Sequence, residues 1–197
     1  MNAERKPERG ARPVAIPSQT VGPFFHFGLT TDASLGRLAG PGALGDPLRL
    51  EVRVLDGQGV PVPDAMVEIW QADAQGVYVE RPDGEARPAF VSSGRLPTDE
   101  TGVCTFDTVR PGRAPDGQGG RQAAHVNVCL FARGLLRQLH TRVYFAGDPA
   151  LEGDAALARV PADRRDTLLA GPSKHDPELW QFELRLQGER ETVFFDV

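Results

Sequence analysis

Two segments in which apolar and polar residues alternate place the tightest limit on the fold of this chain. In residues 180–187, WQFELRLQ, and residues 48–55, LRLEVRVL, every second side chain is apolar. Successive side chains of a strand point to opposite faces, so each segment predicts a strand with one buried and one solvent-facing side. The Asp56-Gly57 step predicts a turn directly after the strand at residues 48–55.

Short apolar segments separated by glycine and proline continue this pattern. With 22 glycines and 17 prolines, the chain favours turns and short strands over long helices. One helix is predicted at residues 161–170, because Pro161 suits a first turn and Gly171-Pro172 ends it. The predicted fold class is therefore all-β, a β-sandwich with little helix. The further strands predicted are Met66–Trp70, Val103–Val109, His125–Phe131, His140–Ala146 and Thr192–Val197.

The composition divides the chain into three parts. Residues 1–17 are rich in Arg, Glu and Pro and predict a flexible arm. Residues 18–47 begin with SQTVGPFFHFGL, which holds three phenylalanines within four positions, and predict a docking segment at a pocket, followed by a loop. Residues 48–197 predict the β-sandwich core. A chain of 197 residues suits one domain with such an arm.

Charge and hydropathy exclude several classes of partner. The net charge is −5, the sequence pI is about 5.4, and basic residues are not clustered, so we expect no nucleic-acid or anionic-membrane surface. No run approaches the roughly 18 apolar residues that a membrane span requires. The charged start of the sequence has no apolar signal region, and Cys104 and Cys129 lie in predicted strands. Free buried thiols fit a reducing compartment, so we expect a cytoplasmic protein.

Half of a metal site is present in the predicted strand 125–131. His125 and Asn127 share one face of that strand, where a His-x-His pair would direct two imidazoles at one ion. An amide is a poor ligand for iron, copper or zinc, so the residues favour His125 as a core histidine. Two interpretations of Tyr78 remain: a phenolate ligand for ferric iron and, more commonly, a partly buried aromatic beside a turn.

Arg133 is a candidate for binding an anion. It directly follows the apolar VNVCLFA segment and precedes the flexible Gly134, so its guanidinium fork suits a carboxylate in a cleft. The commoner alternative is a solvated arginine at a strand end. The other histidines, His26, His140 and His175, have no spacing that joins them into a site. No catalytic triad, phosphate-binding loop or CxxC pair is present, so no catalytic residue is predicted.

Five segments together form a specific pattern: SQTVGPFFHFGL, LRLEVRVLDGQGVPVPDAMVEIWQADAQGVY, TDETGVCTF, AAHVNVCLFARGLLRQLHTRVYF and LQGERETVFFDV. Through these segments the chain resembles the intradiol ring-cleavage dioxygenases from about residue 17 to residue 197. The combination is specific enough that chance is a poor explanation. The resemblance implies the same β-sandwich fold.

In that family a catalytic chain holds ferric iron through two tyrosines and two histidines, and this sequence departs from that set. The match places Tyr78 at the first tyrosine and Ala114 at the second, in the run PGRAP. The His-x-His pair matches His125 and Asn127, and Gln122 replaces an arginine that assists the substrate. The resemblance therefore implies that this chain contributes no metal ligand and no catalytic residue.

The resemblance implies an alpha-type subunit that packs against an iron-bearing beta subunit of the same fold. It places Thr20, Gly22 and Pro23 in the wall of the partner's iron site. It also places Arg133 at the carboxylate of the substrate, 3,4-dihydroxybenzoate (protocatechuate). O2 would cleave this ring to 3-carboxy-cis,cis-muconate in aromatic catabolism, with Fe(III) as the cofactor and no nicotinamide or flavin.

Two alternatives remain open beside the iron-free subunit. One is a homomeric intradiol dioxygenase with unusual ligands, although the sequence offers no obvious replacement for Ala114 and Asn127. The other is a non-catalytic β-sandwich that binds small aromatic acids or acts as a scaffold. Dependence on a partner separates them, because only the subunit gains ring-cleaving activity when a beta chain is added.

Overall fold

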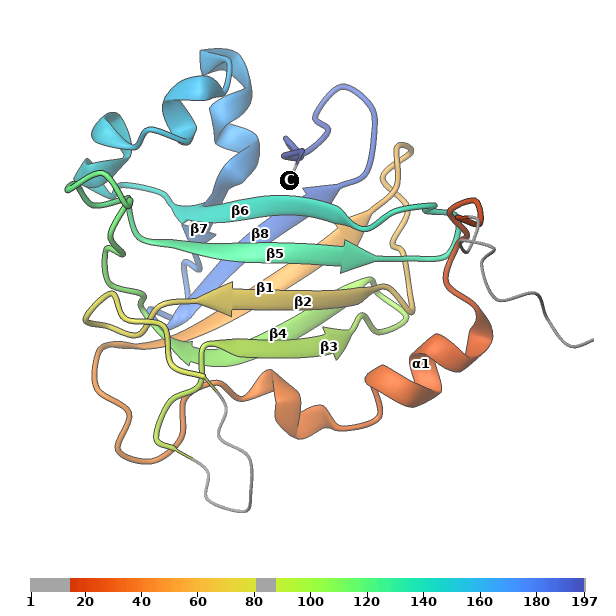
Figure 1. Cartoon of the computed structure of the whole chain (residues 1–197), viewed down its shortest axis with the longest axis horizontal. Coiled ribbons are helices and arrows are strands. Elements are labelled where there is room, and N and C mark those ends of the chain that lie inside the picture. The colour runs from red at the N-terminus through yellow and green to blue at the C-terminus, as the bar shows by residue number, and fades with distance from the viewer. Residues whose placement is uncertain (1–14, 81–87, 197) are drawn as a thin grey trace, which may run out of the picture.

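The computed structural model describes residues 15–80 and 88–196, in which eight strands form one strongly curved sheet (Figure 1). The strand order is β3-β2-β5-β6-β7-β8-β1-β4. The β3-β2-β5-β6 half faces the β8-β1-β4 half across a shared apolar core, and β7 joins the two. This confirms the predicted all-β sandwich. The strands are β1 (Pro47–Leu55), β2 (Met66–Gln71), β3 (Ser93–Pro97), β4 (Val103–Val109), β5 (His125–Phe131), β6 (Leu139–Phe145), β7 (Leu169–Pro172) and β8 (Leu179–Arg185).

Helical structure in the described residues is short. The α-helix α1 spans Pro23–Leu29 and lies beside the sheet in Figure 1. A 3-10 segment, η1, follows it, and three more connect β6 to β7. The 3-10 segments are η1 (Ala33–Gly36), η2 (Pro149–Gly153), η3 (Leu157–Arg159) and η4 (Ala162–Leu168).

Alternation predicted the long strands well. The four apolar side chains of β1 that were expected to face inward, Leu48, Leu50, Val52 and Val54, are at most 2% exposed. In β8, Phe182 and Leu184 are buried in the same core, whereas Gln181 and Glu183 are exposed. Predicted and observed bounds agree for β4 and β5 and differ by one or two residues at an end in β1, β2, β6 and β8. The period-two pattern is reliable here because one face of each strand is fully buried.

Two predicted elements are wrong. Residues 192–196 form no strand: Phe195 makes a single bridge to His140, and Val197 lies outside the described residues. The predicted helix 161–170 is instead η4 followed by β7. Parallel pairing of β7 with β6, and the hydrogen bond from Ala146 N to Ala170 O at 2.9 Å, favour an extended backbone there. Tertiary pairing therefore overrides the local helix signal.

The aromatic segment near the start of the chain packs only partly on the sheet. The ring of Phe25 contacts that of Phe131 at the end of β5, with centroids 5.5 Å apart. Phe24 and Phe27 are 83% and 68% exposed. The division into a flexible arm, a docking segment and a core stays a prediction, and most of the arm, residues 1–14, lies outside the described residues.

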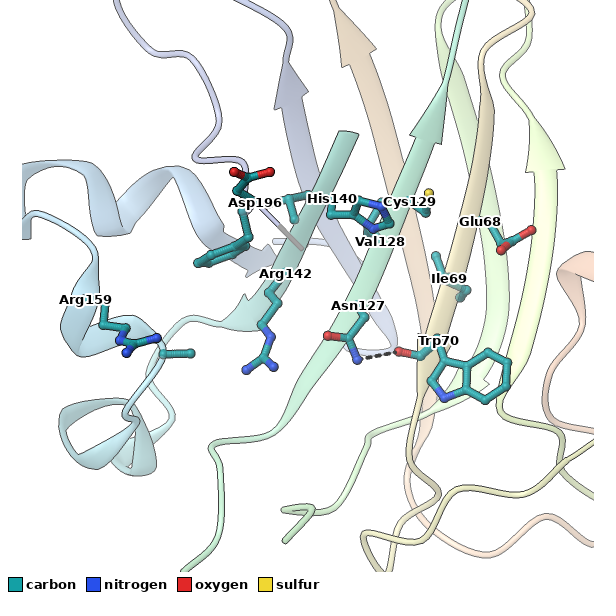
Figure 2. Close-up of a pocket in the computed structure, with 13 residues that line it drawn as sticks. Glu68, Ile69, Trp70, Asn127, Val128, Cys129, His140, Arg142, Arg159 and Asp196 are labelled. Atoms are coloured by element: carbon teal, nitrogen blue, oxygen red, sulfur yellow. Dashed lines mark hydrogen bonds between the residues drawn. The ribbon is translucent and has the colours of Figure 1, made fainter. Parts of the chain in front are cut away.

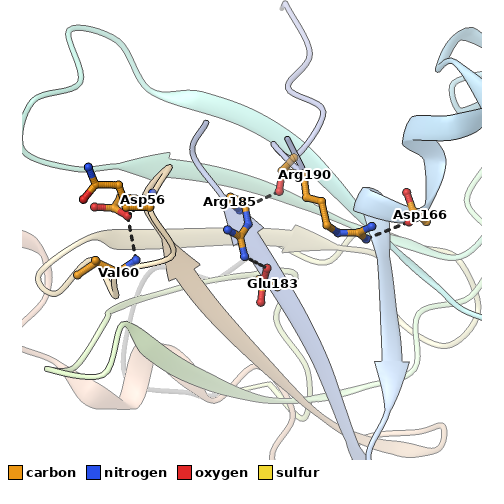
Figure 3. Close-up of polar contacts among 8 residues, drawn as sticks. Asp56, Val60, Asp166, Glu183, Arg185 and Arg190 are labelled. Atoms are coloured by element: carbon orange, nitrogen blue, oxygen red, sulfur yellow. Dashed lines mark hydrogen bonds and ion pairs between the residues drawn. The ribbon is translucent and has the colours of Figure 1, made fainter. Parts of the chain in front are cut away.

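The polar contacts at the surface stabilise turns and chain ends and do not hold the two halves of the sheet together (Figure 3). The carboxylate of Asp56 accepts a hydrogen bond from Val60 N at 2.9 Å, which confirms the turn predicted after β1. Arg185 pairs with Glu183, and Arg190 pairs with Asp166 at 2.9 Å, linking the end of the chain to η4. Exposed pairs of this kind contribute about 0–1 kcal/mol each, so the apolar core carries the fold.

The two cysteines are free thiols, as expected from the sequence; Cys104 is buried and Cys129 is half-buried. Burial raises the pKa of Cys104 to about 12 and that of Cys129 to about 11, so both stay protonated at neutral pH. Within the described ranges, no helix has the length and apolar character needed to cross a membrane.

We predict that Leu50→Ala lowers the free energy of unfolding by about 2–5 kcal/mol, because it leaves a cavity between the two halves of the sheet. Leu50 is 0% exposed, whereas Leu44 is 70% exposed. The matched control Leu44→Ala should change stability by less than about 0.5 kcal/mol. Urea denaturation followed by fluorescence measures both, and equal effects would contradict the assignment of the core.

Candidate functional site

The four residues that match the family's ligand positions are Tyr78, Ala114, His125 and Asn127. Two of them, Tyr78 and Ala114, lie in loops that pack closely against each other. Tyr78 follows the turn after β2, and Ala114 lies in the loop after β4. Gly112 N donates to Asp73 O at 2.7 Å across this contact. A Cβ at Gly112 would collide with the carbonyl of Ala74, so glycine is required for the approach.

His125 lies at the start of β5 and is 4% exposed. Its Nδ1 lies 2.8 Å from Ala123 O, and because a carbonyl only accepts, Nδ1 carries the proton and donates. Nε2 is then the unprotonated nitrogen of the neutral ring. Burial, and after it the positive charge of Arg142, hold the pKa of His125 below its ordinary value. His125 is therefore a neutral, buried ring, as its interpretation as a core histidine requires.

Asn127 occupies the second position of the His-x-His pattern and bonds within the chain. Its Nδ2 donates to Trp70 O at 3.3 Å and to the Tyr78 hydroxyl at 3.4 Å. The rings of Trp70 and Tyr78 stack with centroids 6.2 Å apart and are 44% and 38% exposed. The amide therefore presents hydrogen atoms, and not a lone pair, to the phenol oxygen.

A buried polar network lies beside His125 on the same face of the sheet. Arg142 on β6 donates to Gln122 Oε1 at 2.8 Å and to the Tyr144 hydroxyl at 3.4 Å. Tyr144 in turn donates to Asp154 Oδ1 at 3.0 Å, and burial raises the pKa of Tyr144 to about 12. This network holds the guanidinium of Arg142 through one nitrogen, Nη1.

Asp154 anchors that network to the connection after η2. It is 1% exposed and accepts hydrogen bonds from the backbone N–H groups of Ala123, Ala156 and Leu157. Burial alone would raise the pKa of Asp154, but these backbone bonds and the bond from Tyr144 more than offset it, so the pKa lies below its ordinary value. Asp154 is therefore a charged anchor at neutral pH.

The predicted substrate residues gather at the other end of β5. Arg133 is exposed just after the strand, and Gly134 N donates to Thr20 Oγ1 at 2.8 Å. Gly22 is the N-cap of α1, and Pro23 is its first residue. The structure thus joins Thr20 to the Arg133 turn, which lies 114 residues away in sequence from it. That these residues bind substrate stays a prediction.

A pocket of about 380 Å³ lies on the outer face of β2, β5 and β6 (Figure 2). It contains Trp70, Arg142 and Arg159, none of which the sequence analysis selected. Alternation along HTRVYF could have placed Arg142 on the same strand face as His140, but only the pairing of β6 with β5 shows that Arg142 lies beside Asn127. Arg159 lies in η3 and had no signal in the sequence.

A family model described as Dioxygenase matches residues 21–188. The chain is 39% identical over 193 residues to the protocatechuate 3,4-dioxygenase alpha chain of Pseudomonas putida, covering 91% of this chain and 95% of that one. The chain belongs to the intradiol dioxygenase family. It is also 31% identical to the protocatechuate 3,4-dioxygenase beta chain of Burkholderia cepacia, covering 89% of this chain and 77% of that one.

Solved structures of intradiol dioxygenases share the fold. Catechol 1,2-dioxygenase from Pseudomonas arvilla C-1 matches with a TM-score of 0.60 and 27% identity, over 79% of this chain and 56% of that one. Hydroxyquinol 1,2-dioxygenase from Pseudomonas putida DLL-E4 matches with a TM-score of 0.62 and 24% identity, over 90% and 69%. The identification as an intradiol dioxygenase fold, expected from the sequence motifs, is confirmed.

The intradiol dioxygenase family is iron-dependent, but the ligand positions of this chain do not fit a ferric ion. Ala114 is buried and offers only a methyl group, and the Asn127 amide donates to Tyr78. The charge of Arg142, which already lowers the pKa of His125, also opposes a cation there. Among the described residues, no three His, Cys, Asp or Glu side chains are grouped to hold a metal. Tyr78 and His125 alone are half of the family's donor set.

We predict that the free energy of unfolding decreases as the pH falls from about 7.5 to about 5.5, in part through His125. An unfolded histidine takes up a proton near about pH 6.5, whereas folded His125 does so only at lower pH. The unfolded state then binds more protons below that pH, so acid favours unfolding. Urea denaturation at each pH should show a smaller decrease in His125→Gln.

The control for this prediction is His175→Gln, which changes an exposed histidine. It should leave the acid-induced decrease as large as in the parent chain. A decrease of the same size in His125→Gln as in the parent chain would contradict the assignment to His125.

Proposed function

We propose that the chain is the iron-free alpha subunit of a heteromeric protocatechuate 3,4-dioxygenase. Its partner would be a beta subunit that holds the Fe(III) cofactor. The complex would cleave 3,4-dihydroxybenzoate with O2 to 3-carboxy-cis,cis-muconate. The observation that carries this proposal is the bond from Asn127 to Tyr78, together with the methyl group of Ala114. Of the four ligand positions, Ala114 has no donor atom and Asn127 has only an amide, a poor ligand for iron, while 39% identity to alpha chains extends over almost the whole chain.

In this proposal the chain binds and orients the substrate, and the iron of the partner supplies the redox chemistry. The guanidinium of Arg133 would pair with the substrate carboxylate in two parallel hydrogen bonds. The bond from Gly134 N to Thr20 holds the segment with Gly22 and Pro23 against the Arg133 turn. This contact would let both segments form one wall of the partner's pocket.

The exposed side of α1 supports a partner. Phe24 and Phe27 are largely exposed while Phe25 packs on Phe131, so α1 is anchored on one side and presents two aromatic rings on another. Large exposed apolar groups of this kind are typical of protein interfaces. We assign this surface to the beta subunit. The free cysteines fit the proposed cytoplasmic location of such a complex.

Iron loading of the full chain, alone and with a beta subunit, tests whether the beta subunit and not this chain holds the iron. We predict that the chain alone, incubated with ferric iron and desalted, stays colourless and holds far less than one iron per chain. The complex should be coloured and active, because tyrosinate bound to Fe(III) absorbs visible light. A coloured, iron-loaded chain without the partner would favour the homomeric alternative. No gain of activity with any beta subunit would favour the binding or scaffold module.

We predict that Arg133→Ala raises the Michaelis constant of the complex for 3,4-dihydroxybenzoate by about tenfold to a hundredfold. A hydrogen bond between charged groups contributes about 1.5–3 kcal/mol, which sets this range. Steady-state oxygen consumption measures it. Catechol, which lacks the carboxylate, is the control substrate and should be affected little. An unchanged Michaelis constant for 3,4-dihydroxybenzoate would remove Arg133 from the substrate site.

A further inference from the structure

We propose that the pocket on the outer face of β2, β5 and β6 binds a small aromatic carboxylate, with Arg142 and Arg159 holding its charge. We propose binding only, with no reaction at this site, and the binding does not depend on the proposed beta partner. The volume of about 380 Å³ lies within the range of about 300–1,000 Å³ that is usual for small-molecule sites.

Strand register builds the floor of the pocket in two rows. In one row Trp70, Asn127 and Arg142 are aligned across the three strands. In the next row Glu68, Cys129 and His140 are aligned in the same way. Because alternate residues of a strand share a face, both rows point to the same side of the sheet. The floor is therefore basic at one end and contains Glu68 at the other.

The two guanidinium groups converge on one side of the pocket. In Figure 2 the side chains of Arg142 and Arg159 extend toward the same region, and Glu68 lies at the far end beyond Asn127. Asp196 lies beside His140, whose neighbour in the isolated bridge is Phe195. Among the residues drawn in Figure 2, the carboxylates of Glu68 and Asp196 lie away from the two guanidinium groups, so an anion beside the arginines would experience both positive charges.

The hydrogen-bonding capacity of the arginines is only partly used. Arg142 donates through Nη1 to Gln122 and Tyr144, and Asp154, whose charge it senses, is already held by three backbone N–H groups. Arg159 makes no side-chain hydrogen bond or ion pair within the described residues, and it is exposed. A guanidinium carries five N–H donors in a fork that matches a carboxylate. A bound carboxylate would satisfy the donors that remain.

Aromatic surface next to these charges favours an aromatic anion over a simple inorganic one. Trp70 is 44% exposed and lines the pocket, and so does Phe195, which forms a bridge with His140 of β6. Rings of this kind stack on planar ligands. Chemistry on the ligand is disfavoured, because burial raises the pKa of Cys129, the thiol in the pocket, to about 11.

Fluorescence titration of the full chain with benzoate tests the proposal. The chain contains two tryptophans, so in Trp180→Phe the emission comes from Trp70 alone. Benzoate should change this emission saturably, whereas benzamide, which has the same ring without the charge, should bind at least about tenfold more weakly. Equilibrium dialysis of benzoate with the parent chain gives the same comparison without the Trp180 substitution.

Variants separate the site from general attraction by positive charge. Arg159→Ala should weaken benzoate binding by about tenfold or more, since Arg159 has no described partner whose loss would disturb the fold. Arg53→Ala, which removes an exposed arginine from β1 in the other half of the sheet, should leave binding unchanged. Arg142→Gln should act as Arg159→Ala does, with thermal unfolding measured alongside.

Three results would overturn the proposal. The first is no saturable binding of benzoate by dialysis or fluorescence. The second is equal binding of benzoate and benzamide, or equal binding by the parent chain and Arg159→Ala. The third is inorganic phosphate binding more tightly than benzoate, which would show that the aromatic walls play no part. Because all measurements use this chain without a partner, they succeed or fail independently of the subunit proposal.

Discussion

The pairing of β5 between β2 and β6 is the constraint on which the rest of the structure depends. The inward side chains of β5, Val126, Val128 and Leu130, are at most 2% exposed in the core between the two halves of the sheet. Their burial fixes the register, because a slip of one residue would turn all of them outward. With that register set, His125, Asn127 and Cys129 must share the opposite face, where both the ligand positions and the pocket lie.

The same register explains how an intradiol dioxygenase fold is kept in a chain whose residues do not fit iron. The surroundings of each ligand position are bonded within the protein: Asn127 to Tyr78 and Trp70, His125 to Ala123, and Arg142 to Gln122. Buried polar groups without partners are costly, so these bonds matter to stability as well as to function. The guanidinium of Arg142 adds positive charge to this face of the sheet and makes it more suited to an anion than to a cation.

The two ends of β5 thus have different chemistry. At its start, buried polar groups surround His125, and the pocket beyond them holds Arg142 and Arg159. At its end, the exposed Arg133 turn is tied to Thr20 and lies close to the partly exposed aromatic segment of α1. One strand therefore carries both the proposed contribution to a partner's site and the proposed anion pocket. The Arg133 turn and the residues around His125 are kept apart by the length of β5, because each residue of a strand advances the chain by about 3.3 Å.

Much of this could be predicted from the sequence, and the physical reason is burial on one face. Alternation located β1, β4, β5 and β8 because each packs one side against the core, and motif resemblance identified the family that the comparisons confirm. Once the resemblance had placed Ala114 at a ligand position, the loss of that ligand followed, because the methyl side chain of alanine has no lone pair in any fold. By contrast, β7 and the irregular 192–196 segment depend on pairing with distant residues, which local patterns do not encode.

The sequence by itself determined the fold class, the family and the residue types at the four ligand positions. Only the tertiary structure decided what surrounds them: that Arg142 lies across from Asn127, that Asp154 anchors Tyr144, and that Arg159 from a separate 3-10 segment reaches the same pocket. These side chains come from segments that meet only after β5, β6 and the connection after β6 have packed. Their contacts are set by strand register and loop position, which no local pattern in the chain specifies.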